Sequence, residues 1–256
     1  MNDIRSRILE KLGEIERTEH VKILHCVESG SRAWGFPSPD SDYDVRFIYL
    51  RERDFYLDLS PQRDVIEWQL DDVYDISGWD VQKLLRLLYK SNPTVFEWAA
   101  SPIVYRTAPD WETVAKLIPS YFRVKSGLHH YLSMADGNCK AYLQGETVRL
   151  KKYFYVLRPL LACRWIIDRQ TPPPMLFSEL MQAELAPEMQ PVVDALLARK
   201  QETSELGTDK PIAPLHAYID RQLAEIKQIA EQMPAPPHPD WAPLNQAFLN
   251  LLTPHS

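Results

Sequence analysis

The fold is decided by residues 21–50, which read VKILHCVESGSRAWGFPSPDSDYDVRFIYL. Residues 21–27 are apolar and rich in β-branched side chains, and they lead into a Ser-Gly-Ser turn around Gly30, which predicts a strand that ends in a turn. A loop rich in proline and serine follows at 36–41, and residues 42–50 then alternate as a second strand. The stretch therefore predicts two strands joined by a glycine turn and a loop.

Two carboxylates stand at the start of the second strand. Asp42 and Asp44 are two residues apart, so alternation places both side chains on one face, where they can share a hard divalent cation. Gly30 lets a phosphate approach the backbone at the turn, a following helix N-terminus offers N–H donors, and Ser31 adds a hydroxyl donor. Metal carboxylates beside a phosphate cradle suit in-line attack at a nucleotide phosphorus. One Mg²⁺ neutralises the leaving pyrophosphate there, and a second lowers the pKa of the attacking hydroxyl.

A two-metal site of this kind usually takes a third carboxylate from a neighbouring strand. We expect that residue to be Asp75, which lies late in a strand candidate at 73–76, just before a helix. Asp71 shares the parity of Asp75, whereas Asp72 would need a register shift to reach the same face. The predicted catalytic and metal-binding residues are therefore Asp42, Asp44 and Asp75.

Outside this stretch, hydrophobic periodicity predicts an α+β half followed by a helical half. In the first half, the pattern predicts helices at 4–15, 79–89 and 93–100 and strands at 65–70 and 73–76. Beyond about residue 119, it predicts helices at 121–143, 147–168, 178–185, 191–205 and 214–232, and an extended proline-rich strap at 234–243. The change in pattern predicts two domains, at 1–118 and 119–256.

The spacing of Gly30-Ser31, Asp42-Tyr43-Asp44 and a later strand aspartate resembles the signature of the polymerase-β-type nucleotidyltransferase superfamily. Longer strings resemble one bacterial and phage branch of predicted nucleotidyltransferases, often described as RNA-ligase-associated. Those strings are GSRAWG at 30–35, SDYDVR at 41–46, DISGWD at 75–80, SNPTVFE at 91–97, KKYFY at 151–155 and Arg158-Pro159. The resemblance covers roughly residues 20–170.

The resemblance implies a fold and an activity. The fold is a minimal mixed β-sheet flanked by helices, which forms a nucleotidyltransferase catalytic domain at 1–118 ahead of a mainly helical C-terminal domain at 119–256. The activity is transfer of a nucleoside monophosphate from a nucleoside triphosphate, dependent on Mg²⁺ or Mn²⁺, with two ions in the active complex and ATP as the expected nucleotide. The acceptor stays open among an RNA end, a protein hydroxyl and a small molecule.

Several basic residues are candidates for binding the nucleotide beside Gly30 and Ser31. Arg32 reaches either a triphosphate or a nearby acid such as Asp40 or Glu28. On a helix, Lys151, Tyr155 and Arg158 fall on one side, next to an apolar stripe. That side is either a phosphate- or acceptor-binding surface or a solvated face with apolar stems. The predicted nucleotide-binding residues are Gly30, Ser31, Arg32, Lys151, Lys152 and Arg158.

Composition and charge argue against several classes of protein. The 256 residues carry 29 Lys and Arg against 35 Asp and Glu, a net charge of −6, which argues against a protein held on nucleic acid by bulk charge. No window approaches the ~18 apolar residues that span a bilayer, and the N-terminus lacks a signal-peptide core, so we expect a cytoplasmic protein without a membrane partner. Cys26, Cys139 and Cys163 are too scattered for a disulfide framework and are expected to be buried thiols.

Two other classes of function compete with an active transferase. One is a catalytically silent nucleotide- or RNA-binding regulatory module of the same fold. The other is a glycosyltransferase, in which a D-x-D pair also holds a metal nucleotide. That class usually places a nucleotide-binding sheet of roughly a hundred residues ahead of the pair. Only 41 residues precede Asp42 in this chain, which disfavours a glycosyltransferase.

Overall fold

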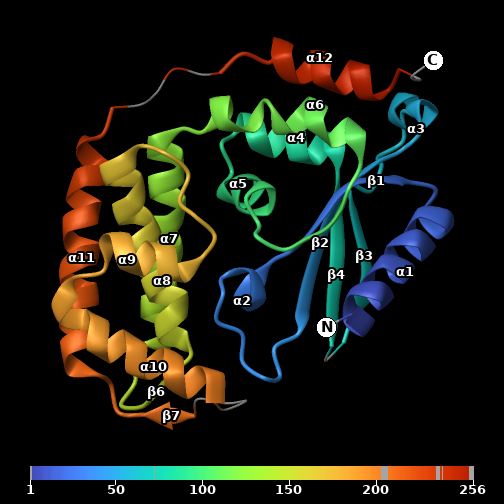
Figure 1. Cartoon of the computed structure of the whole chain (residues 1–256). Coiled ribbons are helices and arrows are strands. Elements are labelled where there is room, and N and C mark those ends of the chain that lie inside the picture. The colour runs from blue at the N-terminus through green and yellow to red at the C-terminus, as the bar shows by residue number, and fades with distance from the viewer. Residues whose placement is uncertain (1, 72, 203–206, 235–236, 238, 254–256) are drawn as a thin grey trace. The chain divides into compact units, whose positions relative to one another are not determined.

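The computed structural model describes residues 2–71, 73–202, 207–234, 237 and 239–253 (Figure 1). Contacts divide the chain into two compact units. The sheet unit comprises Met1–Ala33, Asp42–Tyr121 and His238–Ser256, and the helical unit comprises Trp34–Ser41 and Phe122–Pro237. A division at 118/119 follows the chain linearly, whereas the contacts assign the loop at 34–41 to the helical unit and the C-terminal segment to the sheet unit.

The sheet unit contains α1 (Asn2–Glu19), β1 (Lys22–Glu28), α2 (Gly30–Ala33), β2 (Tyr43–Leu50), α3 (Arg53–Leu57), β3 (Val65–Leu70), β4 (Tyr74–Asp80), α4 (Val81–Tyr89), α5 (Pro93–Ala99), β5 (Val104–Thr107), α6 (Glu112–Ala115) and α12 (Ala242–Leu251). Its sheet has the strand order β3-β4-β2-β1-β5. β2 runs parallel to β4, while the pairs β1/β2, β1/β5 and β3/β4 are antiparallel. The mixed sheet with flanking helices confirms the predicted α+β class.

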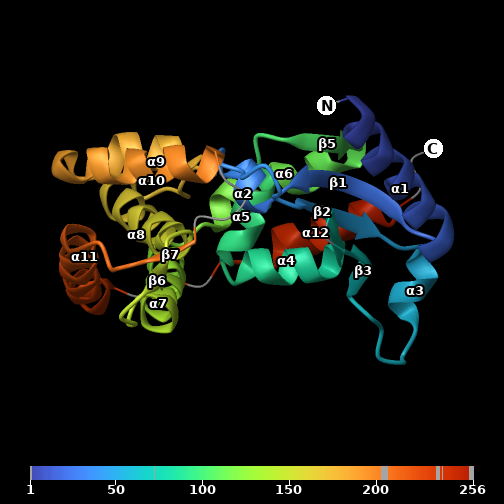
Figure 2. The ribbon, with the colours of Figure 1, turned by 90° about the horizontal axis from the view of Figure 1, so that it is seen from below.

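Helices cover both faces of this sheet. On one face, the side chains at positions 8, 12 and 15 of α1 are fully buried in a cluster with Val45, Phe47 and Tyr49 of β2. Because side chains alternate along a strand, Asp44 and the other even-numbered residues of β2 point to the opposite face. α4 packs on β2 and β4, and Figure 2 shows α1 and α4 on opposite sides of the sheet.

Several boundaries in the sheet unit differ from the sequence prediction. β4 continues to Asp80 because it is paired on both sides, with β2 and with β3, so α4 begins at Val81 and not at residue 79. β5 and α12 were not predicted; α12 begins at Ala242, within the strap expected at 234–243, of which residues 235, 236 and 238 lie outside the described residues. The predicted start of α5 is confirmed: the Asn92 side chain accepts a hydrogen bond from the Thr94 N–H, with Pro93 in the first turn.

The helical unit contains α7 (Val124–Tyr142), β6 (Val148–Arg149), α8 (Lys152–Arg169), α9 (Phe177–Glu184), α10 (Gln190–Glu202), β7 (Thr208–Asp209) and α11 (Ala213–Gln232). The predicted helices are present, with ends that differ from the prediction by up to five residues. α8 begins five residues after the predicted 147 because β6 pairs with β7. The predicted helix at 191–205 extends into residues 203–205, which lie outside the described part. Short 3₁₀ turns complete the two units at Pro109–Trp111, Ile118–Tyr121 and Pro187–Met189.

The core of the helical unit is built mainly from α7, α8, α9 and α11. It includes Phe36 of the loop at 34–41, whose ring lies 5.0 Å from that of Phe154 and 5.2 Å from that of Phe177. Lys200 of α10 is buried beside it and donates to the Phe36 carbonyl at 2.9 Å. The loop that joins the two halves of the predicted motif is therefore part of the helical core. Within the described part of the chain, no helix has the length and apolarity needed to cross a bilayer.

Candidate active site

The turn after β1 is pressed against the first residues of β2. The Ser29 N–H donates to the Asp44 carbonyl at 2.8 Å, and Gly30 starts the short helix α2 with φ +58°. A Cβ built on Gly30 would lie 1.9 Å from Asp44 Oδ2, closer than any side chain could stand. Gly30 is therefore required twice, for its backbone conformation and for the space that the Asp44 carboxylate occupies.

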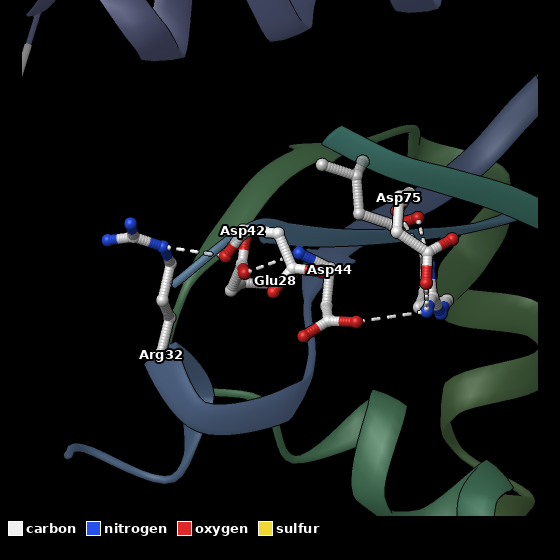
Figure 3. Close-up of polar contacts among 7 residues, drawn as sticks. Glu28, Arg32, Asp42, Asp44 and Asp75 are labelled. Atoms are coloured by element: carbon white, nitrogen blue, oxygen red, sulfur yellow. Dashed lines mark hydrogen bonds and ion pairs between the residues drawn. The ribbon is translucent and has the colours of Figure 1, made fainter. Parts of the chain in front are cut away.

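Asp44 and Asp75 are direct neighbours across the parallel pair β2/β4. Between them lies Arg46, whose Nη2 donates to Asp44 Oδ1 at 3.1 Å and to Asp75 Oδ2 at 2.5 Å, while its Nη1 donates to the Asp75 carbonyl at 2.6 Å. One guanidinium thus holds both carboxylates. Figure 3 shows Asp44 and Asp75 on adjacent strands, with Asp42 and Glu28 to one side.

Asp42 precedes β2 by one residue. Its carbonyl accepts a hydrogen bond from Arg32 Nε at 2.9 Å, and the Arg32 guanidinium lies 3.8 Å from the centroid of the Tyr43 ring. Arg32 is thus held against the residues that flank the start of β2, a contact that neither alternative from the sequence included. Ser31, the second residue of α2, is half-buried.

Glu28 is a site residue that sequence reasoning missed. It ends β1, its side chain is buried, and its Oε1 accepts the Asp44 N–H at 2.8 Å while its other carboxylate oxygen accepts the Tyr105 hydroxyl. Burial raises the pKa of Glu28 to about 7, although both hydrogen bonds favour the ionised form. An acid that closes an apolar strand directly before the glycine turn was the available signal, but its partner Tyr105 lies 77 residues away.

The electrostatics of the site centre on Asp44. Burial raises the pKa of the Asp44 carboxyl to about 6. The Arg46 guanidinium opposes that rise, while the charges of Asp42 and Asp75 add to it. The site therefore concentrates negative charge that favours a cation.

The donor chemistry suits a hard divalent cation, because carboxylate oxygens are its preferred ligands. No group of three or more His, Cys, Asp or Glu side chains lies close enough to hold a metal ion among residues 2–71, 73–202, 207–234, 237 and 239–253. In this structure the cation beside Asp44 and Asp75 is the Arg46 guanidinium. These two carboxylates, with Asp42, are the candidates for holding a metal, and Arg46 bonds one oxygen of each, Asp44 Oδ1 and Asp75 Oδ2.

The other predicted nucleotide-binding residues belong to the helical unit. Arg158 is buried in the helical core; its Nη2 donates to Met175 Sδ at 3.4 Å and its guanidinium lies 4.7 Å from the Trp34 ring centroid. The predicted position of Arg158 on a charged helix side is therefore wrong. Lys151 and Lys152 stand at the start of α8, where the Lys152 ammonium lies over two tyrosine rings.

Comparison with known proteins gives three findings. The family model described as "RNA repair pathway DNA polymerase beta family" (RlaP) matches residues 4–250. A Bacillus subtilis (strain 168) protein, "Uncharacterized protein YcgL", is 45% identical over 249 residues, which is 96% of each chain. A solved structure of a nucleotidyltransferase-like protein from Exiguobacterium sibiricum 255-15 is 12% identical, with a TM-score of 0.33, over 89% of this chain and 74% of that one.

Proposed function

The chain belongs to the RNA repair pathway DNA polymerase beta family, and from that membership we propose that it transfers a nucleoside monophosphate from a nucleoside triphosphate to an acceptor hydroxyl. Mg²⁺ or Mn²⁺ is the proposed cofactor, with two ions in the active complex and ATP as the expected nucleotide. Among an RNA end, a protein hydroxyl and a small molecule, the family description favours an RNA end as the acceptor.

The observation that carries this proposal is the close approach of Gly30 to Asp44. A turn that tolerates no side chain is pressed against a carboxylate, and that carboxylate lies beside Asp75 on the neighbouring strand. The charges of two further acids, Asp42 and Asp75, add to the rise in the pKa of Asp44. Neighbouring carboxylates repel one another when they are ionised, and a bound cation offsets that repulsion.

Each residue has a proposed task. Asp42, Asp44 and Asp75 hold the cation, which neutralises charge on the triphosphate and lowers the pKa of the acceptor hydroxyl when bound. Asp75 also helps to accept the proton of that hydroxyl. Ser31 donates its hydroxyl to a phosphate oxygen, and Arg32 supplies positive charge at the same turn.

Arg46 balances the charge of the site when no other cation is present. It holds one oxygen of Asp44 and one of Asp75, and the second oxygen of each carboxylate is the proposed ligand for the divalent cation.

The test is a labelling experiment with the full chain. The protein is incubated with each α-³²P-labelled nucleoside triphosphate, Mg²⁺ or Mn²⁺, and a mixture of RNA, protein and metabolites. We expect label on RNA, dependent on the divalent ion and abolished by a chelator. Label on the protein itself would point to self-modification, and absence of label from every acceptor would contradict transfer.

Arg46 also favours a second candidate, the catalytically silent nucleotide-binding module. If the guanidinium permanently replaces the cation, a nucleotide can bind at the turn without reaction. Calorimetry separates the two functions. Heat of nucleotide binding with no pyrophosphate release across all acceptors supports the silent module, whereas release of pyrophosphate contradicts it.

A further inference from the structure

Two neighbouring helices of the helical unit carry its exposed large apolar side chains among the described residues. Among its described residues, the large hydrophobic side chains with substantial exposure are Met134, Tyr142 and Tyr155, at 40%, 41% and 42%. All three belong to α7 or α8, which lie side by side in Figures 1 and 2. Exposed aromatic rings in a unit that buries most of its large apolar side chains are a candidate contact surface.

The two tyrosines share one cation. The Lys152 ammonium lies 4.0 Å from the ring centroid of Tyr142 and 4.6 Å from that of Tyr155. The side chain of Asn138, one helical turn before Tyr142, donates to the Tyr155 carbonyl at 2.9 Å and ties the two helices together here. We refer to Tyr142, Lys152 and Tyr155 as the tyrosine platform.

The platform continues inward as an alternation of rings and cations. The Tyr155 ring meets the Trp34 ring edge-on, with centroids 6.0 Å apart, and Arg158 lies over Trp34. Trp34 is the residue directly after α2 in the chain, four residues after Gly30. Arg158 thus supports a ring, although it is too buried to bind a nucleotide itself.

The charge around the platform is positive. Residues 138–155 contain Lys140, Arg149, Lys151 and Lys152 against the single acid Glu146. Lys140 pairs with Asp136, while Arg149 is exposed and Lys151 precedes Lys152 at the start of α8. Of these cations, Lys152 lies against the exposed rings, in a chain whose net charge is −6.

We propose that the tyrosine platform binds single-stranded nucleic acid, with bases stacked on Tyr142 and Tyr155 and the intervening phosphate at Lys152. Exposed rings alternating with cations are the means by which proteins hold single strands, since every base has a face to stack and every linkage a negative charge. A duplex does not fit, because its bases are already stacked on one another. The inference rests on the proposed function in one respect, that the bound strand supplies the acceptor hydroxyl.

The experiment measures binding directly, so that it does not depend on catalysis. A fluorescent single-stranded oligoribonucleotide of mixed sequence is titrated with the full chain, beside a single-stranded DNA and an RNA duplex of the same sequence. The variants are Tyr142→Ala with Tyr155→Ala, and as the matched control Tyr142→Phe with Tyr155→Phe, which keeps both rings. Lys152→Gln is titrated at several salt concentrations.

We expect the alanine pair to weaken single-strand binding roughly tenfold or more for each ring, and the phenylalanine pair to bind as wild type. Lys152→Gln should lower the slope of log Kd against log salt by about 0.7. Better binding of RNA than of DNA identifies RNA as the strand. Equal affinity of the alanine and phenylalanine pairs, equal binding of the duplex, or no binding of either single strand by wild type would overturn the inference.

A variant in the sheet unit separates this inference from the proposed function. Asp42→Asn with Asp44→Asn should bind the oligonucleotide as wild type does, because the platform lies in the helical unit. If transfer is never detected but the ring-dependent binding is, the platform stands and the enzymatic proposal fails. If transfer occurs but the alanine and phenylalanine variants bind the oligonucleotide equally, the inference about the platform is wrong and the enzymatic proposal stands.

Discussion

Gly30 contributes to the site through the side chain it lacks. A left-handed backbone costs a non-glycine residue about 1–2 kcal/mol, and the added Cβ would meet Asp44 Oδ2 at 1.9 Å and displace the carboxylate. We expect Gly30→Ala to lower the free energy of unfolding by about 2 kcal/mol and nucleotidyl transfer roughly a hundredfold, the effect of a misplacement of about 1 Å.

Gly13→Ala is the matched control for that prediction. Gly13 lies inside α1 of the same unit, where an added Cβ meets only the end of the Arg17 side chain at 3.5 Å. Alanine favours a helix over glycine by about 1 kcal/mol, so this variant should be at least as stable as wild type and equally active. Urea unfolding and steady-state transfer measure both effects. A Gly30→Ala variant that behaves like Gly13→Ala would show that the turn does not set the position of Asp44.

Glu28 gives the site a pH dependence. Its pKa is raised from 4.5 to about 7 in the folded protein, so the protonated form contributes stability that is present below pH 4.5 and lost as the pH rises through about 7. Glu28→Gln keeps a side chain that can bond to the Asp44 N–H and the Tyr105 hydroxyl, but it does not titrate. Relative to wild type, the variant should therefore gain about 2–3 kcal/mol between pH 4.5 and pH 8. Urea unfolding at both pH values measures the gain. A difference between the two proteins that does not change with pH would contradict the raised pKa.

Sequence spacing could identify Asp42 and Asp44 as neighbours because Asp44 lies in β2 and Asp42 lies one residue before that strand. It selected Asp75 for a place late in a strand just before a helix, whereas Asp75 is the second residue of β4, and the register with β2 is what places it beside Asp44. Glu28 and Arg46 could not be assigned in the same way. Their roles depend on Tyr105 from β5 and on the pairing of β2 with β4, and no local pattern encodes those contacts.

At the scale of elements, α12 is a helix that the sequence pattern did not predict, because it begins beside a proline-rich segment. It follows a proline-rich segment that predicted a strap, yet its own proline lies in the first turn, where proline is compatible with a helix. The Trp241 ring just before it stacks on Tyr89 at 3.7 Å, and the Phe248 ring meets Tyr56 at 5.0 Å. These contacts join the last described helix to α4 and α3 of the sheet unit. A local sequence pattern cannot predict these contacts, because the partner residues lie more than 150 residues earlier in the chain.

α12 offers a matched pair of leucines for measuring its contribution. Leu244 is 1% exposed and Leu249 is 57% exposed on the same helix. Leu244→Ala should lower the free energy of unfolding by about 2–4 kcal/mol, whereas Leu249→Ala should change it by less than about 0.5 kcal/mol. Chemical denaturation followed by tryptophan fluorescence measures both. Equal effects of the two substitutions would contradict the docking of α12.

At the scale of the molecule, the chain passes between the two units four times. A composition change near residue 119 predicted the main passage, since strand patterns stop there. The other passages could not be predicted, because they depend on where single side chains are buried. Phe36 enters the helical core from a loop rich in proline and serine, and its two neighbouring segments lead to Gly30 on one side and Asp42 on the other.

The structure also shows which contacts the basic residues of the helical unit make. Seven of the 29 basic residues fall between residues 140 and 169. The structure divides them by partner, with Lys140, Arg164 and Arg169 in ion pairs with Asp136, Glu225 and Glu184, and Arg158 buried on Trp34. Arg149 ends β6, Lys151 and Lys152 stand at the start of α8, and Lys152 is part of the tyrosine platform. The sequence could count these cations but could not show which of them form ion pairs and which lie over aromatic rings.

The central claim is that the carboxylates at the start of β2 hold the cation for nucleotidyl transfer. The most direct measurement is pyrophosphate release with α-labelled ATP, Mg²⁺ and acceptor, comparing wild type with Asp42→Asn/Asp44→Asn. Glu67→Gln/Glu112→Gln is the matched control, since it removes two carboxylates of the same unit that are 78% and 66% exposed. Losing a cation worth several kcal/mol in the transition state should lower the rate by roughly a thousandfold or more, with thermal stability maintained and the control fully active. Undiminished release of pyrophosphate by the Asp42→Asn/Asp44→Asn protein would contradict the account.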